Sequence, residues 1–345
     1  MAKTKKNLNI SIPDYFSESK VVSTYSSSFN KALGGGLEMG STVQITAESG
    51  MGKSTIALST AAQICYQGYN VVYLDTENSI TKELMLGTHA MNCLKESSEH
   101  GQLILVKESR FKEVEEILDS LITTKDISFI FVDSLAGLIN DGYLNVDDGI
   151  SITNKNTNYD TRPLNLFCNK YNSMASTHNF GLIYLNQFRN KVDFKSSAPT
   201  IIKEFGCKNI KYNSDIILWI NKPKTLKKDV LKDENGNELG INLEFEIKKS
   251  NKCIPNVKIP FYLLYGKGIS DLMGIIPVLI EKGLILKSSN GYYTVLFSKD
   301  KKKLHGITEL HSYLAKNYDE LCSTLDPLFE ESARPITVGL TGSSS

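Results

Sequence analysis

The chain has 345 residues, and its 39 Lys and Arg against 38 Asp and Glu give a formal net charge of +1. This balance argues neither for nor against a nucleic-acid partner, since any basic surface would have to be local. No run of about 18 apolar residues occurs, so we expect no membrane span, and the basic N-terminus lacks the apolar core of a secretory signal. Six scattered cysteines without a Cys-x-x-Cys pair indicate reduced thiols in a cytoplasmic protein.

A chain of this length is expected to hold one large domain and a smaller one. The basic and Ser-rich residues 1–32 are predicted as an arm that could hold a short helix or strand and need not belong to the main core. Residues 33–270 are predicted as an α/β core. The pattern changes near residue 271 and predicts a small α+β domain over 271–330, followed by a flexible tail over 331–345. In the small domain the predicted elements are a helix over 274–287, a strand over 292–295 and a helix over 307–318.

The core alternates between short apolar runs and helical patterns, which predicts a mostly parallel sheet with helices on both faces. The main predicted elements are strand 43–47, helix 53–67, strands 71–74 and 103–106, helix 114–123, strand 129–132, helix 163–179 and strand 182–185. The later strands come without intervening helices and predict an antiparallel extension at one edge. These strands are 215–220, 243–247 and 257–264.

The strongest local signal lies at 43–55, where an apolar run passes through Gly50 and Gly52 to Lys53 and a helix-forming stretch. Glycines let the backbone curl so that several N–H groups point at one anion, and the helix N-terminus adds its positive dipole end. Lys53 is expected to reach the β- and γ-phosphates, and Ser54 to place a hydroxyl on Mg²⁺. The predicted nucleotide-binding residues are Ala47, Glu48, Ser49, Gly50, Met51, Gly52, Lys53, Ser54 and Thr55.

Three polar residues come at or just after the ends of apolar strands, namely Glu77, Asp133 and Gln187. Because the carboxyl ends of parallel strands meet at one edge of a sheet, we expect all three beside the phosphate loop. Asp133 would lie near Mg²⁺, most simply through a water, and Glu77 would orient the attacking water. Gln187 would sense the γ-phosphate and signal to the following loop. A helix-capping role for Glu77 and an ordinary polar strand end at Gln187 remain open.

Two long segments, 140–160 and 191–213, show no regular pattern, and such loops in compact domains are usually functional. The second segment and its flanks carry six basic residues against Asp193 and Glu204. The basic residues are Arg189, Lys191, Lys195, Lys203, Lys208 and Lys211. A Lys-rich loop can follow a phosphate backbone, and Phe194 could wedge between bases, although such loops are also often only solvated.

In this order the motifs resemble the RecA family of DNA recombinases. The resemblance extends beyond the phosphate loop to Gly34–Gly40, Ile247–Pro255, Phe261–Gly268, Gly274–Leu284 and Gly291–Tyr293. Three departures suggest a divergent member, of phage or cellular origin. Ala47 replaces the first glycine of the loop, the segment 140–160 is rich in Asn and Asp, and Lys249 and Lys252 stand three apart rather than two.

For the nucleotide site, the resemblance implies ATP and Mg²⁺ held by Lys53, Ser54 and Asp133. Glu77 is implied as the catalytic carboxylate, and Gln187 as the switch between ATP and DNA.

In this family ATP lies between protomers. Lys211 and Tyr212 would therefore contact a neighbouring subunit's nucleotide. Lys249 and Lys252 would reach its γ-phosphate and take part in catalysis across the filament interface. The arm over 1–32 would serve oligomerisation.

The resemblance also implies that the segments 140–160 and 191–210 are two DNA-facing loops. The implied DNA-binding residues are Arg162, Arg189, Lys191, Phe194, Lys195, Lys203 and Lys208.

The resemblance thus predicts an ATP-dependent DNA recombinase, which hydrolyses ATP to ADP and phosphate. It would form a helical homo-oligomeric filament on single-stranded DNA and promote homologous pairing and strand exchange with double-stranded DNA in recombination and repair. Two alternatives remain open. One is a ring-forming helicase or motor of the same fold, and the other is a non-catalytic filament or mediator protein.

Overall fold

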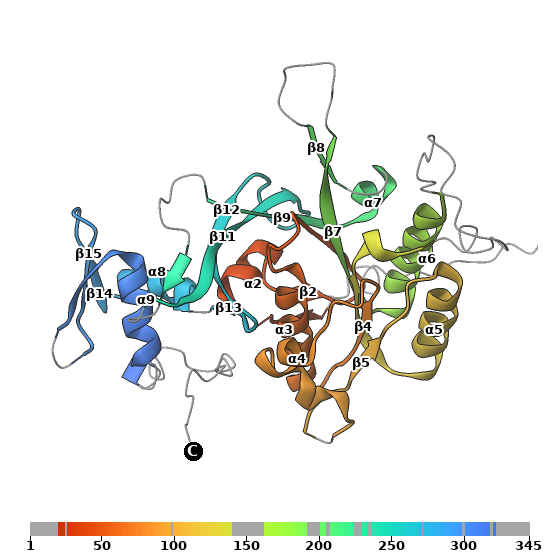
Figure 1. The fold of residues 1–345 in the computed structure, drawn as a ribbon, viewed down its shortest axis with the longest axis horizontal. Helices are drawn as coiled ribbons and strands as arrows, with labels where there is room; N and C mark the ends of the chain where they lie inside the picture. Colours follow the sequence, from red (N-terminus) through yellow and green to blue (C-terminus); the bar gives the residue numbers. More distant parts are fainter. Residues whose placement is uncertain are drawn as a thin grey trace, which may run out of the picture.

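The computed structural model is drawn in Figure 1, and it describes most of the chain. The described residues are 20–24, 26–97, 99–139, 162–191, 201–204, 208–223, 230–232, 236–270, 272–298, 301–317 and 320–321.

A large sheet forms the centre of the molecule, with eleven strands among the described residues. Its parallel part follows the spatial order β9, β3, β7, β6, β4, β5. These strands are β9 (Ile216–Asn221), β3 (Thr42–Ala47), β7 (Gly181–Lys191), β6 (Ile127–Asp133), β4 (Asn70–Asp75) and β5 (Leu103–Val106). Their continuous apolar character follows from burial on both faces, and it confirms the predicted α/β class.

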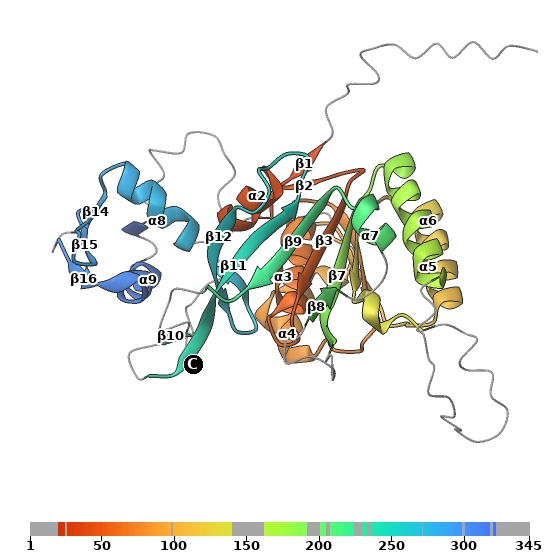
Figure 2. The same ribbon diagram turned by 90° about the horizontal axis from the view of Figure 1, so that it is seen from above.

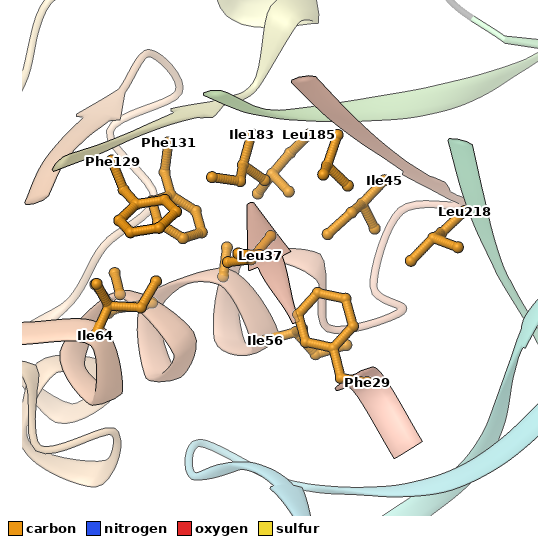
Figure 3. Packing of buried hydrophobic residues seen from close by; sticks show 14 of the residues in the cluster. Phe29, Leu37, Ile45, Ile56, Ile64, Phe129, Phe131, Ile183, Leu185 and Leu218 are labelled. Carbon is orange, nitrogen blue, oxygen red and sulfur yellow. The ribbon is translucent and has the colours of Figure 1, made fainter. Parts of the chain in front are cut away.

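Helices cover both faces of the parallel strands (Figure 2). One face carries α3 (Lys53–Tyr66), α4 (Lys82–Gly87) and the 3₁₀ helix η1 (Ala90–Leu94), whereas the other carries α5 (Phe111–Thr124) and α6 (Arg162–His178). Two apolar clusters result, and alternate residues of β4 enter different clusters. Figure 3 shows the α3 cluster, in which side chains of β6 and β7 face Ile56 and Ile64.

Among the described residues no helix combines the length and apolarity needed to cross a bilayer.

The antiparallel extension lies at the β9 edge, as predicted. β11 (Glu238–Lys249) pairs antiparallel with β9 and with β12 (Lys258–Leu264). β13 (Gly268–Ser270) and the short β10 (Val230–Lys232) complete this part. Since β12 is antiparallel to β11, it runs in the same direction as β3. The end of β12 therefore lies at the same edge of the sheet as the end of β3.

The described part of the N-terminal segment packs on the core, which the sequence pattern left open. β1 (Val21–Val22) pairs with β2 (Leu37–Glu38), and α2 (Ser27–Leu33) packs against the core. The Phe29 ring is 2% exposed and stacks on Phe245 at 5.0 Å between centroids. A seven-residue helix offers too few residues for a clear helical period, so the sequence pattern could not decide between a short helix and a strand. Residues 1–19 lie outside the described residues.

The segment 191–213, expected to lack regular structure, contains two short elements. β7 continues to Lys191 and forms a hairpin with β8 (Ile201–Glu204), and α7 (Lys208–Asn213) follows. In Figure 1 the hairpin projects away from the body of the sheet. The prediction was wrong here because strand pairing in a projecting hairpin depends on its partner strand rather than on a buried apolar face. The segment 140–160 lies outside the described residues.

A small unit follows the core. It contains α8 (Leu272–Glu281), β14 (Ile285–Lys287), β15 (Tyr292–Val295), β16 (Lys303–His305) and α9 (Gly306–Lys316). The helix predicted over 274–287 ends at Glu281, because Gly283 adopts a left-handed φ of 71° and the chain then enters β14. His311 on α9 is 2% exposed and forms a 2.7 Å hydrogen bond with Ser270 of β13, which ties the unit to the core.

Replacing Phe29 with Ala tests whether α2 belongs to the core. The lost ring leaves a cavity against Phe245, so the free energy of unfolding should fall by about 3–5 kcal/mol, measured as a lower urea midpoint. The control Leu86→Ala alters a side chain that is 53% exposed, and it should change stability by less than about 0.5 kcal/mol. Equally small effects of both changes would show that α2 is peripheral.

The buried His311 predicts a loss of stability in mild acid. Burial lowers its pKa to about 4, whereas an unfolded histidine titrates near about 6.5. The unfolded state therefore takes up the proton first as the pH falls, and stability is lost between these two values. Between pH 7 and pH 5 this group should cost about 2 kcal/mol. Urea midpoints at both pH values should show this loss in the wild type and in the exposed control His305→Gln. The loss should be reduced in His311→Phe, and an unchanged pH dependence in that variant would contradict the assignment.

Candidate nucleotide-binding site

The loop between β3 and α3 has the backbone shape of an anion-binding turn. Gly50 and Gly52 adopt left-handed φ values of 77° and 75° immediately before the first turn of α3. An added Cβ at Gly52 would come 2.0 Å from Leu263 Cδ2 on β12, so only glycine fits there. At Gly50 no atom lies within 4 Å of an added Cβ. The loop is thus supported on the β12 side and open beside Gly50, as a phosphate cradle requires.

Lys53 begins α3 and folds back over this loop. Its ammonium donates to the carbonyl oxygens of Glu48 at 2.9 Å and Ala47 at 3.3 Å, and the residue is 8% exposed. Burial lowers the pKa of Lys53, whereas the negative charges of Asp133 and Glu77 act in the opposite direction. The three charged groups that the sequence placed at one sheet edge are therefore close enough to interact.

Strand register brings the other polar groups to the same edge. Gln187 pairs with Ala47 across β7 and β3, and Asp133 pairs with Asp75 across β6 and β4. The carboxylate of Asp75 accepts from the backbone N–H groups of Ser79 and Ile80 at 3.0 and 3.1 Å, so it organises the turn after β4. Sequence reasoning gave no role to Asp75, although its place at a strand end was a usable signal.

Asp133 lies deep beside the start of α3, 3% exposed. Tyr73 donates its hydroxyl to Asp133 Oδ2 at 2.7 Å. Burial raises the pKa of Asp133, whereas hydrogen bonds from the side chains of Ser54 and Tyr73 lower it. The predicted pair Ser54 and Asp133 therefore lie near each other.

Glu77 and Gln187 are joined directly. Gln187 Nε2 donates to Glu77 Oε1 at 2.7 Å, and the hydroxyl of Ser134 donates to the same oxygen. Thr76 ties the neighbouring strand ends together, since its N–H donates to Asp133 O at 2.8 Å and its hydroxyl to Ser134 O at 2.7 Å. The sequence predicted that Glu77 and Gln187 lie at one edge of the sheet, but it did not reveal Ser134 as a hydrogen-bond partner of Glu77.

The residues present fit a magnesium nucleotide. Among the described residues no group of three or more His, Cys, Asp or Glu could hold a metal ion alone. Mg²⁺ in nucleotide sites is typically held by one or two protein groups, with phosphate oxygens and waters as the remaining ligands. Ser54 and Asp133 can supply this protein share, and the open loop can take the phosphates.

Four of the predicted nucleotide-contacting residues lie at the opposite, amino edge of the parallel strands. Lys249 Nζ donates to the carbonyl oxygens of Lys211, Tyr212 and Ser214 at 3.2, 2.8 and 2.6 Å, just before β9 begins. Lys252 pairs with Glu38 at 2.6 Å, ahead of β3. The six residues of β3 separate this edge from the phosphate loop by roughly 20 Å at about 3.3 Å per residue.

Lys211, Tyr212, Lys249 and Lys252 therefore cannot reach the phosphate loop of their own chain. Tyr212 is 73% exposed at this edge and is available to another molecule.

The structure places only part of the predicted DNA-binding set. Arg162 is an exposed residue at the start of α6. Four others belong to the β7–β8 hairpin and to α7, and Arg189 pairs with Lys203 in the register of the hairpin. They are Arg189, Lys191, Lys203 and Lys208. Phe194 and Lys195 lie outside the described residues.

The fold and the site define an α/β protein with a phosphate-binding loop and an acidic strand end beside it. The family model of the RecA N-terminal domain matches residues 13–270. Protein RecA of Arthrobacter sp. (strain FB24) is 29% identical over 317 residues, which cover 90% of this chain and 82% of that protein. Protein RecA of Aquifex aeolicus is 26% identical over 312 residues, with 90% and 81% covered. Protein RecA of Trichormus variabilis is 25% identical over 276 residues, with 79% and 71% covered.

The chain belongs to the RecA family. The identities of 25–29% confirm the interpretation of a divergent member. Family membership gives the general class, which is an ATP-binding and DNA-binding protein of recombination and repair.

Proposed function

We propose that this protein is a DNA-dependent ATPase that forms a helical filament on single-stranded DNA and promotes strand exchange. The hydrogen bond between Glu77 and Gln187 carries this proposal. It joins the carboxylate expected to direct hydrolysis to the strand that leads into the β7–β8 hairpin. A change at the phosphate can thus reach the predicted DNA loop through this hydrogen bond and the backbone of β7. DNA bound in that loop can act on the phosphate site by the same route.

Different side chains of the protein would carry out the separate tasks of hydrolysis. Lys53 exchanges the loop carbonyls for phosphate oxygens and neutralises their charge. Glu77, freed from Gln187, orients a water in line with the γ-phosphate. Gln187 then donates to the γ-phosphate and shifts β7. Bound Mg²⁺, held by Ser54 and Asp133, would add charge neutralisation at the β- and γ-phosphates.

The amino edge supplies the second half of each site from a neighbouring copy. Lys249 and Lys252 are too far from their own phosphate loop, so a head-to-tail contact is required to bring them to a γ-phosphate. Lys211 and Tyr212 lie at the same edge and would contact that nucleotide as well. Such a contact repeats from copy to copy and builds a helix when it does not close.

The remaining assignments follow from this arrangement. Residues 1–32 would contribute to oligomerisation, with α2 anchoring that segment to its own core. The 33–270 core would hold ATP and the DNA loops near 140–160 and 191–210, followed by the small domain 271–330 and the tail 331–345. A cytoplasmic location suits a protein that acts on DNA.

The proposal is tested by ATPase activity with and without single-stranded DNA across a salt series, together with electron microscopy. Helical filaments, and stimulation by DNA that weakens as salt rises, are expected. Closed rings, or no assembly with ATP and DNA together, would overturn the filament.

Two substitutions should separate binding from hydrolysis. Lys53→Ala removes the phosphate cation and should abolish ATP binding, ATPase activity and filaments. Glu77→Gln keeps the shape of the side chain but removes the charge, so ATP binding and filaments should persist while turnover falls about 100-fold or more. Fluorescence titration with an ATP analogue and phosphate release measure the two steps. The exposed control Lys125→Ala should behave as the wild type. An active Lys53→Ala protein would refute the nucleotide site.

Mixing two inactive variants tests whether sites are shared between copies. Lys249→Ala and Glu77→Gln should each be inactive alone. In an equal mixture about a quarter of the head-to-tail interfaces combine an intact Glu77 with a neighbour's intact Lys249, so DNA-dependent ATPase activity should partly return. Mixing Lys53→Ala with Glu77→Gln is the matched control, because both changes affect the same half of the site and no intact site forms. The absence of recovery in the first mixture would argue against a shared site.

A further inference from the structure

Tyr73 is a buried phenol that points its hydroxyl at the phosphate site. It lies in the middle of β4 and is 0% exposed. Its hydroxyl donates to Asp133 Oδ2 at 2.7 Å, and its ring stacks on Phe131 with 5.9 Å between centroids and 10° between planes. A buried phenol needs a hydrogen-bond partner, and here that partner is a nearly buried carboxylate.

The register of the two strands fixes this contact. Tyr73 pairs with Phe131 on β6, and Asp133 lies two residues further along the same strand. Residues two apart in a strand point to the same face, so Phe131 and Asp133 both lie on the α3 side of the sheet. The stacked ring therefore cannot tilt freely, and its hydroxyl holds Asp133 Oδ2 in place.

The Ser54 side chain, at the first turn of α3, also acts on this carboxylate and favours its charged form. Tyr73 thus fixes one oxygen of the carboxylate by a hydrogen bond, on the side of the site where Ser54 begins α3. Groups that orient a metal-associated carboxylate in this way commonly strengthen metal binding.

We infer that Tyr73 is a positioning residue that holds the Asp133 carboxylate in the orientation needed for the magnesium nucleotide. The inference rests on the proposed nucleotide site and adds to it a residue that contacts neither ATP nor Mg²⁺. If the role of Tyr73 were purely structural, loss of its hydroxyl would lower only the stability of the protein. A positioning role also lowers the extent to which Mg²⁺ tightens nucleotide binding, while binding without Mg²⁺ stays the same.

Tyr73→Phe separates these roles, because it removes only the hydroxyl and keeps the stacked ring. The dissociation constant of a non-hydrolysable fluorescent ATP analogue is measured at equilibrium in excess Mg²⁺ and in EDTA. The ratio of the two constants reports how much Mg²⁺ tightens binding. We expect that tightening to fall about tenfold or more in Tyr73→Phe, with an unchanged constant in EDTA. A ratio within about twofold of the wild type overturns the inference.

Tyr184→Phe is the matched control. Tyr184 is also 0% exposed and lies on β7, but its hydroxyl donates to Asn172 at 3.1 Å rather than to the site. This change should lower thermal stability to a similar extent and leave the effect of Mg²⁺ intact. An equal loss of Mg²⁺ tightening in both variants overturns the inference, since the effect would then come from packing.

A double-mutant cycle shows whether Tyr73 acts through Asp133. In an Asp133→Asn background, Tyr73→Phe should change the Mg²⁺ effect by less than about twofold, because the group that it positions is already altered. A tenfold effect that persists in that background overturns the inference. If the wild-type protein binds no analogue in either buffer, the proposed nucleotide site itself fails. That result differs from a wild type that binds tightly with an unaffected Tyr73→Phe variant.

Discussion

The parallel register of β3, β4, β6 and β7 is the constraint on which the site depends. Ala47 pairs with Gln187 and Asp75 with Asp133, so the phosphate loop and the side chains of Gln187 and Asp133 all leave the sheet at one edge. A slip of one residue would turn every core side chain of a strand to the other face. The apolar clusters that stabilise the fold therefore also set where the polar strand ends lie. In this protein, core packing and site geometry have a common cause.

In the proposed filament, the two edges of the same sheet carry complementary halves of one site. The carboxyl edge holds Lys53, Asp133 and Glu77, whereas the amino edge holds Lys249 and Lys252. Because a whole strand separates the edges, one copy cannot bring the halves together. The direction of the strands thus gives the proposed assembly its direction, in which the carboxyl edge of one copy meets the amino edge of the next.

Much of this arrangement could be predicted from the sequence. Buried runs with helical patterns between them gave the parallel core, and the strand-end residues Glu77, Asp133 and Gln187 lie close together as expected. The contacts that hold them could not be predicted, because the bond from Tyr73 to Asp133 depends on strand register and ring stacking. The β7–β8 hairpin was missed, and the type of element formed by α2 stayed open, because both depend on distant partners rather than on a local period.

The three carbonyl contacts of Lys249 bear on the strength of assembly. They place its ammonium at the C-terminal end of α7, where the helix dipole also favours a cation. In the proposed filament, a neighbour's phosphate competes with this internal acceptor set, so the contact is an exchange of partners rather than a net gain of one. Once that phosphate is released, Lys249 can return to its own carbonyls, so a copy of the proposed filament can leave without an unpaired ammonium.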